Sequence, residues 1–168
     1  MCLILLNLST WLGVGLGAAI AITFAILWSC SKEEVTSNVS YEHRVDILTL
    51  KESNFLSLLN EYRRSHNLTV LEPDALAGLE AYKHNVYMIE DGQPSHNNYP
   101  NRQKVLMDNG ALKVGEIIGY GYSGIQGAYM AFLASEEHLR IIKGDYNAVG
   151  VDIMKGDKDF YTIIFIKI

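Results

Sequence analysis

The chain has 168 residues, with 14 Lys and Arg against 19 Asp and Glu, which gives a formal net charge of −5. This acidic balance, without a cluster of basic residues, argues against nucleic-acid binding, because phosphate contacts need clustered Lys and Arg side chains. Only two cysteines occur, Cys2 and Cys30. Because neither lies in the C-terminal part, we expect the globular part to fold on packing alone, without a disulfide.

Residues 1–29 are almost entirely apolar or small and predict a segment that targets or anchors the chain. Residues 1–30 contain no charged side chain, and an uncharged stretch of this length can span a bilayer as a helix. Leu27-Trp28-Ser29-Cys30 resembles a bacterial lipobox, whose cysteine is lipidated and becomes the mature N-terminus. Three interpretations stay open: a lipoprotein signal with lipidation at Cys30, an uncleaved signal anchor, or a buried core helix.

The first two interpretations agree that the rest of the chain lies outside the inner membrane. Residues 30–52 are polar and mixed in charge, and they are predicted to form a tether to a domain at residues 53–168. We therefore expect a protein of the cell envelope, an outer-membrane lipoprotein or a cell-surface protein, with the membrane as a partner. Acyl chains would make the attachment durable, at ~0.8 kcal/mol per buried methylene.

Two helices are predicted at the start of the domain. The first has an apolar face at helical spacing, with Ser53 as its N-cap and Asn67 as its left-handed C-terminal cap. Pro73 is predicted to open the second helix, which ends at the turn Asp91-Gly92. The predicted buried stripe of this second helix consists of Ala75, Leu79, Tyr82, Val86 and Ile89.

The remainder of the domain alternates loops, short helices and strands. A loop between Pro94 and Pro100 holds His96, and a short helix follows at residues 102–109. An irregular strand is predicted at residues 114–122, a helix at residues 124–134, and a further helical turn at residues 136–143. A hairpin of strands 148–154 and 160–166 ends the chain, and its second strand is apolar on both faces, which predicts a central strand. The fold class is therefore α+β: an α-β-α sandwich with a small antiparallel sheet covered by helices on both faces.

Five short segments occur in a fixed order along residues 53–168. They are Leu59-Asn60-Glu61-Tyr62-Arg63 followed by Leu68, then Ser95-His96, Gly115-Glu116, Ser135-Glu136-Glu137-His138, and Tyr146 through Val151 with Val149-Gly150-Val151. Together they resemble the CAP, or SCP-like, superfamily, which includes cysteine-rich secretory proteins, antigen 5 and pathogenesis-related proteins. The fourth segment is similar to the Ser-x-x-His motif of the bacterial branch.

The resemblance implies a central cleft lined by His96, Glu116 and His138. Two imidazoles and a carboxylate suit Zn²⁺ or another divalent metal with one open coordination position. If Ser135 caps the helix that carries His138, the helix dipole is expected to lower the pKa of His138. The alternative is that the two histidines bond to backbone, that Glu116 caps a loop, and that the trio only fixes the cleft.

Further residues have both a functional and a structural interpretation. Ser135 is predicted as a helix N-cap and is also a candidate cleft residue. Tyr120 and Tyr122 either form a mobile rim of the cleft or belong to a glycine-kinked edge strand. The other histidines are predicted to be solvated, whereas two polar residues of the first helix are predicted to tie it to neighbouring loops. These are His43, His66 and His84 in the first group, and Asn60 and Arg63 in the second.

Two functional hypotheses follow from these residues. The favoured one is a non-enzymatic binding module for a lipid, a small apolar ligand or a partner protein of the envelope, which rests on analogy with the family. The alternative is a divalent-metal-dependent hydrolase, with His96 and His138 as ligands and Glu116 as ligand or catalytic base. The sequence does not identify a ligand or substrate.

Overall fold

The structure is a computed structural model that describes residues 48–168. The predicted signal segment, the lipidation site Cys30, most of the tether and His43 lie outside the described residues. Within the described part, no helix is long and apolar enough to cross a membrane.

The described part of the chain begins with helices and ends with a strand hairpin. Its helices are α2 (Leu50–Ser65), α3 (Ala75–Asp91), α4 (Tyr99–Asp108), α5 (Gly124–Ala134) and α6 (Glu136–Ile142). Its strands are β1 (Glu72–Pro73), β2 (Lys113–Tyr120), β3 (Ala148–Lys155) and β4 (Asp159–Lys167). These strands form one sheet in the order β1-β3-β4-β2.

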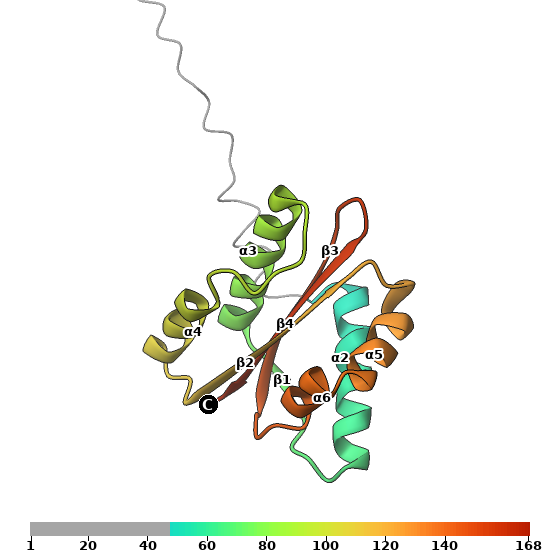
Figure 1. Ribbon diagram of the computed structural model, residues 1–168. Coiled ribbons are helices and arrows are strands. Elements are labelled where there is room, and N and C mark those ends of the chain that lie inside the picture. Colours follow the sequence, from blue (N-terminus) through green and yellow to red (C-terminus); the bar gives the residue numbers. More distant parts are fainter. Residues whose placement is uncertain (1–47) are drawn as a thin grey trace, which may run out of the picture. The chain divides into compact units, whose positions relative to one another are not determined.

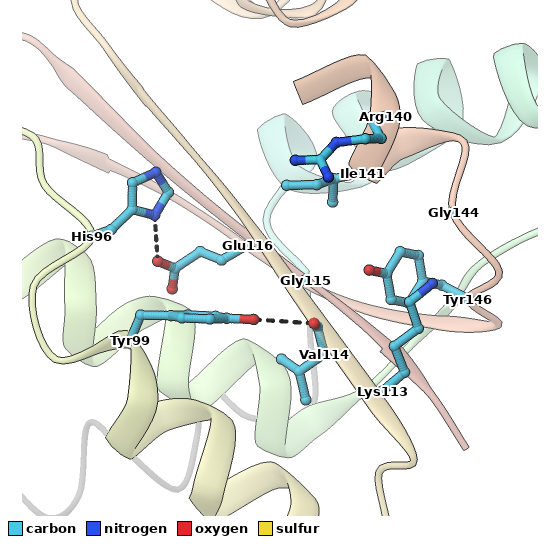
Figure 2. Close-up of a pocket in the computed structure, with 10 residues that line it drawn as sticks. All are labelled: His96, Tyr99, Lys113, Val114, Gly115, Glu116, Arg140, Ile141, Gly144 and Tyr146. Atoms are coloured by element: carbon cyan, nitrogen blue, oxygen red, sulfur yellow. Dashed lines mark hydrogen bonds and ion pairs between the residues drawn. The ribbon is translucent and has the colours of Figure 1, made fainter. Parts of the chain in front are cut away.

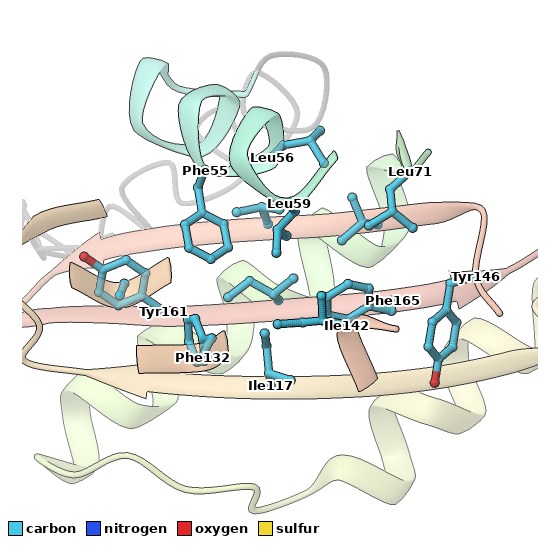
Figure 3. Close-up of a cluster of buried hydrophobic side chains, with 14 residues drawn as sticks. Phe55, Leu56, Leu59, Leu71, Ile117, Phe132, Ile142, Tyr146, Tyr161 and Phe165 are labelled. Carbon is cyan, nitrogen blue, oxygen red and sulfur yellow. The ribbon is translucent and has the colours of Figure 1, made fainter. Parts of the chain in front are cut away.

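Helices cover both faces of this sheet, which confirms the predicted α-β-α sandwich (Figure 1). A large apolar cluster joins α2, α5 and α6 to one face, with Phe55, Phe132 and Ile142 among its buried side chains (Figure 3). On the other face, α3 and α4 pack through a second cluster that includes Ala77, Leu106 and Ile164. The sheet is mixed rather than purely antiparallel, because the two-residue strand β1 pairs parallel to β3.

The first helix is capped earlier in the chain than predicted. Thr49, not Ser53, is the N-cap, and it forms a capping box in which its hydroxyl accepts from the Glu52 amide while the Glu52 carboxylate accepts from the Thr49 amide. This reciprocal pair satisfies two free amides, which a serine inside the helix cannot do. At the other end Asn67 has φ +57°, as predicted for a left-handed cap.

The second helix differs from its prediction in both its start and its buried face. Pro73 lies in β1, and Asp74 is the N-cap, whose side chain accepts from the Ala77 amide at 2.8 Å. The predicted turn at Gly92 is confirmed, with φ +76°. The residues that α3 buries are mostly small or polar, with Met88 as the one large apolar side chain: Ala77, Glu80, Ala81, His84, Asn85 and Met88.

The close approach of α3 to the sheet explains this unusual buried face. A Cβ atom added at Gly150 of β3 would lie 2.1 Å from the backbone carbon of Ala77, so helix and strand are in direct backbone contact. Only small residues fit at such a contact. Further along α3, Asn85 donates to the Asp152 carboxylate at 2.6 Å and accepts from the Thr162 hydroxyl at 2.7 Å. A buried polar residue therefore replaces the large apolar residue that helical periodicity predicts.

The hairpin at the C-terminus follows its prediction closely. Strand β4 lies between β3 and β2, and its residues 160–166 are all buried. Strand β2 is more regular than expected, because every residue from Lys113 to Tyr120 has a partner in β4. Within the part of the chain that the structure describes, β2 pairs on one side only and is an edge strand of the sheet.

Candidate functional site

A buried ion pair joins β2 to the start of α4. The side chain of Glu116 is 1% exposed and that of Arg102 is 7% exposed. The Arg102 guanidinium donates to both carboxylate oxygens, at 2.8 Å to Oε2 and 2.9 Å to Oε1. A third nitrogen of Arg102 donates to the carbonyl of Asn97 at 2.7 Å, which fixes the loop that carries His96.

His96 completes this group by meeting Glu116. Its Nδ1 lies 2.8 Å from Oε1 of Glu116 (Figure 2), and its side chain is 56% exposed. Since a carboxylate accepts hydrogen bonds, Nδ1 carries the proton and Nε2 faces away from Glu116. Burial by itself raises the pKa of Glu116, but the hydrogen bonds from His96 and Arg102 outweigh burial and lower it. Glu116 is therefore an ionised, fully paired carboxylate at neutral pH.

His84 belongs to the same region, which corrects the prediction that it is solvated. It is 2% exposed, and its Nε2 donates to the carbonyl of Ser95 at 2.7 Å. Burial lowers the pKa of His84, and the charge of Arg102 lowers it further. A neutral His84 thus supports the loop directly before His96. His66 is exposed, as predicted.

A pocket of about 330 Å³ lies between His96 and α6, across the edge of β2 (Figure 2). The lining residues come from the His96 loop and α4, from the first half of β2, and from α6 with the segment that follows it. They are His96, Tyr99, Lys113, Val114, Gly115, Glu116, Arg140, Ile141, Gly144 and Tyr146. The hydroxyl of Tyr99 donates to the carbonyl of Val114 at 3.0 Å, which ties the start of α4 to the strand.

Arg63 fixes the end of α6 and the segment that follows it, on the far side of the pocket from His96. Its buried guanidinium donates to four carbonyls, those of Thr69, Ile142, Gly144 and Tyr146. Asn60 makes a reciprocal pair with the backbone of Leu71. Both residues therefore tie the first helix to neighbouring loops, as predicted.

Gly115 lets Tyr146 approach the strand. A Cβ atom at Gly115 would lie 2.5 Å from the Tyr146 hydroxyl, so a larger residue at this position would displace the Tyr146 ring. Lys113 lies with its ammonium 4.5 Å from the centre of the Tyr146 ring. The two residues of the Gly-Glu dipeptide therefore have separate functions. Gly115 makes room for the Tyr146 ring on one side of the pocket, and Glu116 holds His96 on the other side.

His138 lies near this group but does not line the pocket. Burial lowers its pKa, and the charge of His96 lowers it further. The predicted direction of the shift is thus found, with burial instead of the helix dipole as the leading cause. The ring packs edge-on against Phe132 at 5.1 Å, and its buried Nδ1 has no hydrogen-bond partner among the described residues. Ser135 is the N-cap of α6, as predicted, and accepts from the His138 amide at 3.4 Å.

The two tyrosines that the sequence suggested as a rim lie elsewhere. The hydroxyl of Tyr120 donates to Asp157 at 2.8 Å, and the centre of its ring lies 4.6 Å from that of Phe160. Tyr122 packs at the border of the core, against Phe132 and Tyr161. Neither tyrosine lines the pocket beside Glu116.

The arrangement of His96, Glu116 and His138 does not fit a divalent ion. Within residues 48–168, no group of three or more His, Cys, Asp or Glu side chains is placed to hold a metal. Both oxygens of Glu116 already accept from Arg102, whose fixed positive charge would repel a cation.

Several residues of the site were absent from the predicted set. Arg102 had one usable signal: it is spaced four residues from the apolar Leu106, so the two share the buried face of α4. Arg140 and Lys113 had none, because their convergence depends on how α6 packs across the strand edge. Tyr146 begins the fifth family segment, but that segment was predicted only as a strand and not as part of the site.

An α-β-α sandwich with a histidine and a buried glutamate at the edge strand defines an SCP-like domain. The chain belongs to the CAP family, the cysteine-rich secretory protein family, which it matches over residues 56–167. This confirms the resemblance described above. No curated protein sequence matches the chain.

Solved structures of similar fold come from several organisms. An outer surface protein from Borrelia burgdorferi is 21% identical, with a TM-score of 0.64, and the match covers 72% of this chain and 96% of that one. An extracellular protein containing a SCP domain from Bacillus anthracis is 25% identical, with a TM-score of 0.63 and coverage of 70% and 40%. A venom allergen-like protein from Schistosoma mansoni is 13% identical, with a TM-score of 0.59 and coverage of 71% and 90%.

Proposed function

We propose that this chain is a non-enzymatic binding module that holds a segment of a partner or a small ligand in the pocket beside Glu116. The observation that carries the proposal is that Glu116 is fully paired with Arg102 and His96. A carboxylate in this state shapes a pocket, but it is not available as a base or as a metal ligand.

The lining of the pocket also supports binding over catalysis. Among the described residues, those that line the pocket include no serine, threonine or cysteine to act as a nucleophile. Its volume of about 330 Å³ lies at the small end of the range for ligand sites in proteins. A purely apolar lipid fits the pocket less well than a polar ligand does, because Lys113 and Arg140 bring two positive charges to the lining.

We place the module outside the cell, attached by its N-terminal segment. The outer surface and extracellular proteins among the structural relatives support this placement, together with the lipobox-like sequence that ends at Cys30. Labelling cells with a palmitate analogue tests the anchor: wild-type chain is expected to incorporate the label, and the Cys30→Ala variant is not. Labelling of both forms alike would contradict lipidation at Cys30.

Native mass spectrometry of the full chain, purified from its host envelope in mild detergent, tests the binding function. Ile141 lines the pocket, and Ile141→Trp is expected to fill the pocket and remove a bound ligand or partner. Val105→Trp, a change of similar size on the exposed side of α4, is the matched control and is expected to retain it. If no species is bound to the wild type, or if Ile141→Trp retains it, the proposal fails.

A further inference from the structure

The floor of the pocket is the outer edge of β2, with which no other strand of residues 48–168 pairs. In an antiparallel pair, residues that bond to the partner strand alternate with residues whose backbone groups point away from it. The Gly121 amide donates to Asp159 of the neighbouring strand, whereas the Val114 carbonyl accepts from the Tyr99 hydroxyl on the outer side. By this alternation, Val114 and Glu116 direct their amide and carbonyl groups toward the pocket.

These outward groups differ between the two residues. At Glu116 both the N–H and the C=O are without a partner in the described part of the chain, which matches the needs of a peptide amide. At Val114 the C=O already accepts from Tyr99, so that the N–H is the group left for a ligand. The backbone of Glu116 therefore offers a ligand both a donor and an acceptor, whereas the backbone of Val114 offers mainly its N–H donor.

Positive charge lies on the α6 side of the same floor. Arg140 and Lys113 line the pocket, and the Lys113 ammonium lies over the Tyr146 ring (Figure 2). Neither cation forms an ion pair with a carboxylate among residues 48–168, although the charge of Lys113 helps to lower the pKa of Asp145. The acidic Glu116, by contrast, is neutralised by Arg102. A pair of cations without an ion-paired carboxylate, beside a free amide donor, favours a carboxylate ligand, which accepts hydrogen bonds only.

We propose that the pocket binds the C-terminal end of an extended peptide. The last amide of the peptide pairs with the backbone of Glu116, and its terminal carboxylate lies near the Val114 amide, Arg140 and Lys113. This inference rests on the binding function proposed above and specifies its ligand. The mode of recognition is strand addition at a sheet edge, in which main-chain hydrogen bonds supply affinity. The positive charges of Arg140 and Lys113 then select a peptide that ends in a free carboxylate.

The dimensions of the site agree with a short chain end. The floor runs from Val114 to Glu116, and an extended chain rises about 3.3 Å per residue, so about three ligand residues match its length. The Tyr99 hydroxyl already occupies the Val114 carbonyl. A strand that continued past this point would need that acceptor, whereas a terminal carboxylate, which has no donor to offer, does not.

Fluorescence anisotropy with the full chain tests the proposal, using a fluorescein-labelled pentapeptide of glycine, valine and alanine. We expect the free acid to bind at least about tenfold more tightly than the same peptide with a C-terminal amide, since one charge-assisted hydrogen bond has this magnitude. An N-methyl group on the last amide is expected to weaken binding about tenfold or more, because it removes the strand-like hydrogen bond. Equal binding of acid and amide would overturn the proposal.

Protein variants separate the two parts of the site. Arg140→Ala and Lys113→Ala are each expected to reduce the preference for the acid, whereas Lys104→Ala, an exposed lysine of α4 paired with Asp108, preserves it. Tyr99→Phe exposes the Val114 carbonyl and is expected to lower the ratio of acid to amide affinity. In hydrogen exchange, the bound acid is expected to protect the β2 segment of residues 113–120, and an unprotected β2 would refute strand addition.

A carrier protein that ends in the same five residues distinguishes the two sources of such a chain end. Binding of both forms identifies an accessible protein C-terminus as a ligand, and binding of the free peptide alone restricts the ligand to short peptides; either result supports the proposal. If native mass spectrometry finds a species that Ile141→Trp removes, but the pentapeptide acid does not bind, the binding function stands and the peptide inference falls.

Discussion

Arg102 offers the sharpest test of how the site is built. The substitution Arg102→Met keeps an unbranched side chain but removes the charge and three hydrogen bonds, two of them to Glu116 and one to Asn97. Glu116 then remains buried, with His96 as its single side-chain partner. Breaking a buried ion pair by removing one partner costs about 3–5 kcal/mol. Against a total stability of about 5–15 kcal/mol, this is a large effect.

The pH dependence of this loss follows from the direction of the Glu116 pKa. Because the folded-state pKa lies below the ordinary value of 4.5, the paired carboxylate stabilises the fold above that pH, and this contribution is lost as the pH falls through the folded pKa. In the variant, burial dominates and Glu116 protonates at higher pH. We therefore expect the difference in unfolding free energy between wild type and Arg102→Met to shrink as the pH is lowered from about 7 toward about 4.

Urea denaturation followed by far-ultraviolet circular dichroism measures this effect. With a slope of about 2 kcal/mol per molar urea, the midpoint is expected to fall by about 1.5–2.5 M at neutral pH. Lys104→Met, which breaks an exposed ion pair with Asp108, is the control and changes stability by less than about 0.5 kcal/mol. The double variant Arg102→Met with Glu116→Gln is expected to be more stable than Arg102→Met alone. A loss below about 1 kcal/mol, or one that does not vary with pH, would refute this explanation of the pair.

Three other predictions concern the framework around the site. Gly150→Ala forces a Cβ atom onto the backbone of Ala77 and is expected to destabilise the fold by about 3 kcal/mol or more. Gly127→Ala is the control within α5: its added Cβ atom would lie 3.7 Å from the nearest atom, the Cβ of Ser123. This control is expected to stabilise the fold by about 0.5–1 kcal/mol in the same urea assay. Arg63→Lys keeps the charge but not the planar fork that reaches four carbonyls, and a loss of about 3 kcal/mol is expected; an unchanged midpoint would contradict this assignment. The pKa of His84 is lowered in the folded state. The stability that its neutral form supports is therefore present above about pH 6.5 and is lost as the pH falls below that value. Between about pH 7.5 and about pH 5.5, the His84→Gln variant is expected to lose less stability than the wild type.

The fold was predictable wherever side-chain size and polarity report burial directly. The uniformly apolar run of β4 predicted a central strand, and it is central. The face of α3 was not predictable in the same way, because its partner at the contact is the glycine Gly150, and a helix that touches a strand backbone buries alanine instead of leucine. His84 was misjudged for this reason: periodicity assigned it to the solvent side of a stripe of residues, none of which is buried in the structure.

The candidate site shows a similar limit, because its residues follow from tertiary contacts that no local pattern contains. The family resemblance identified His96 and Glu116, which do meet. The two sides of the pocket, however, depend on buried arginines that reach across the fold: Arg102 holds the His96 loop, and Arg63 holds the end of α6. Each of these arginines holds one side of the pocket. Loss of Arg102 is therefore expected to displace the loop that carries His96, and loss of Arg63 is expected to displace the end of α6 that carries Arg140. A ligand that needs both the strand edge and the cations would then be weakened by either change, even though neither arginine lines the pocket.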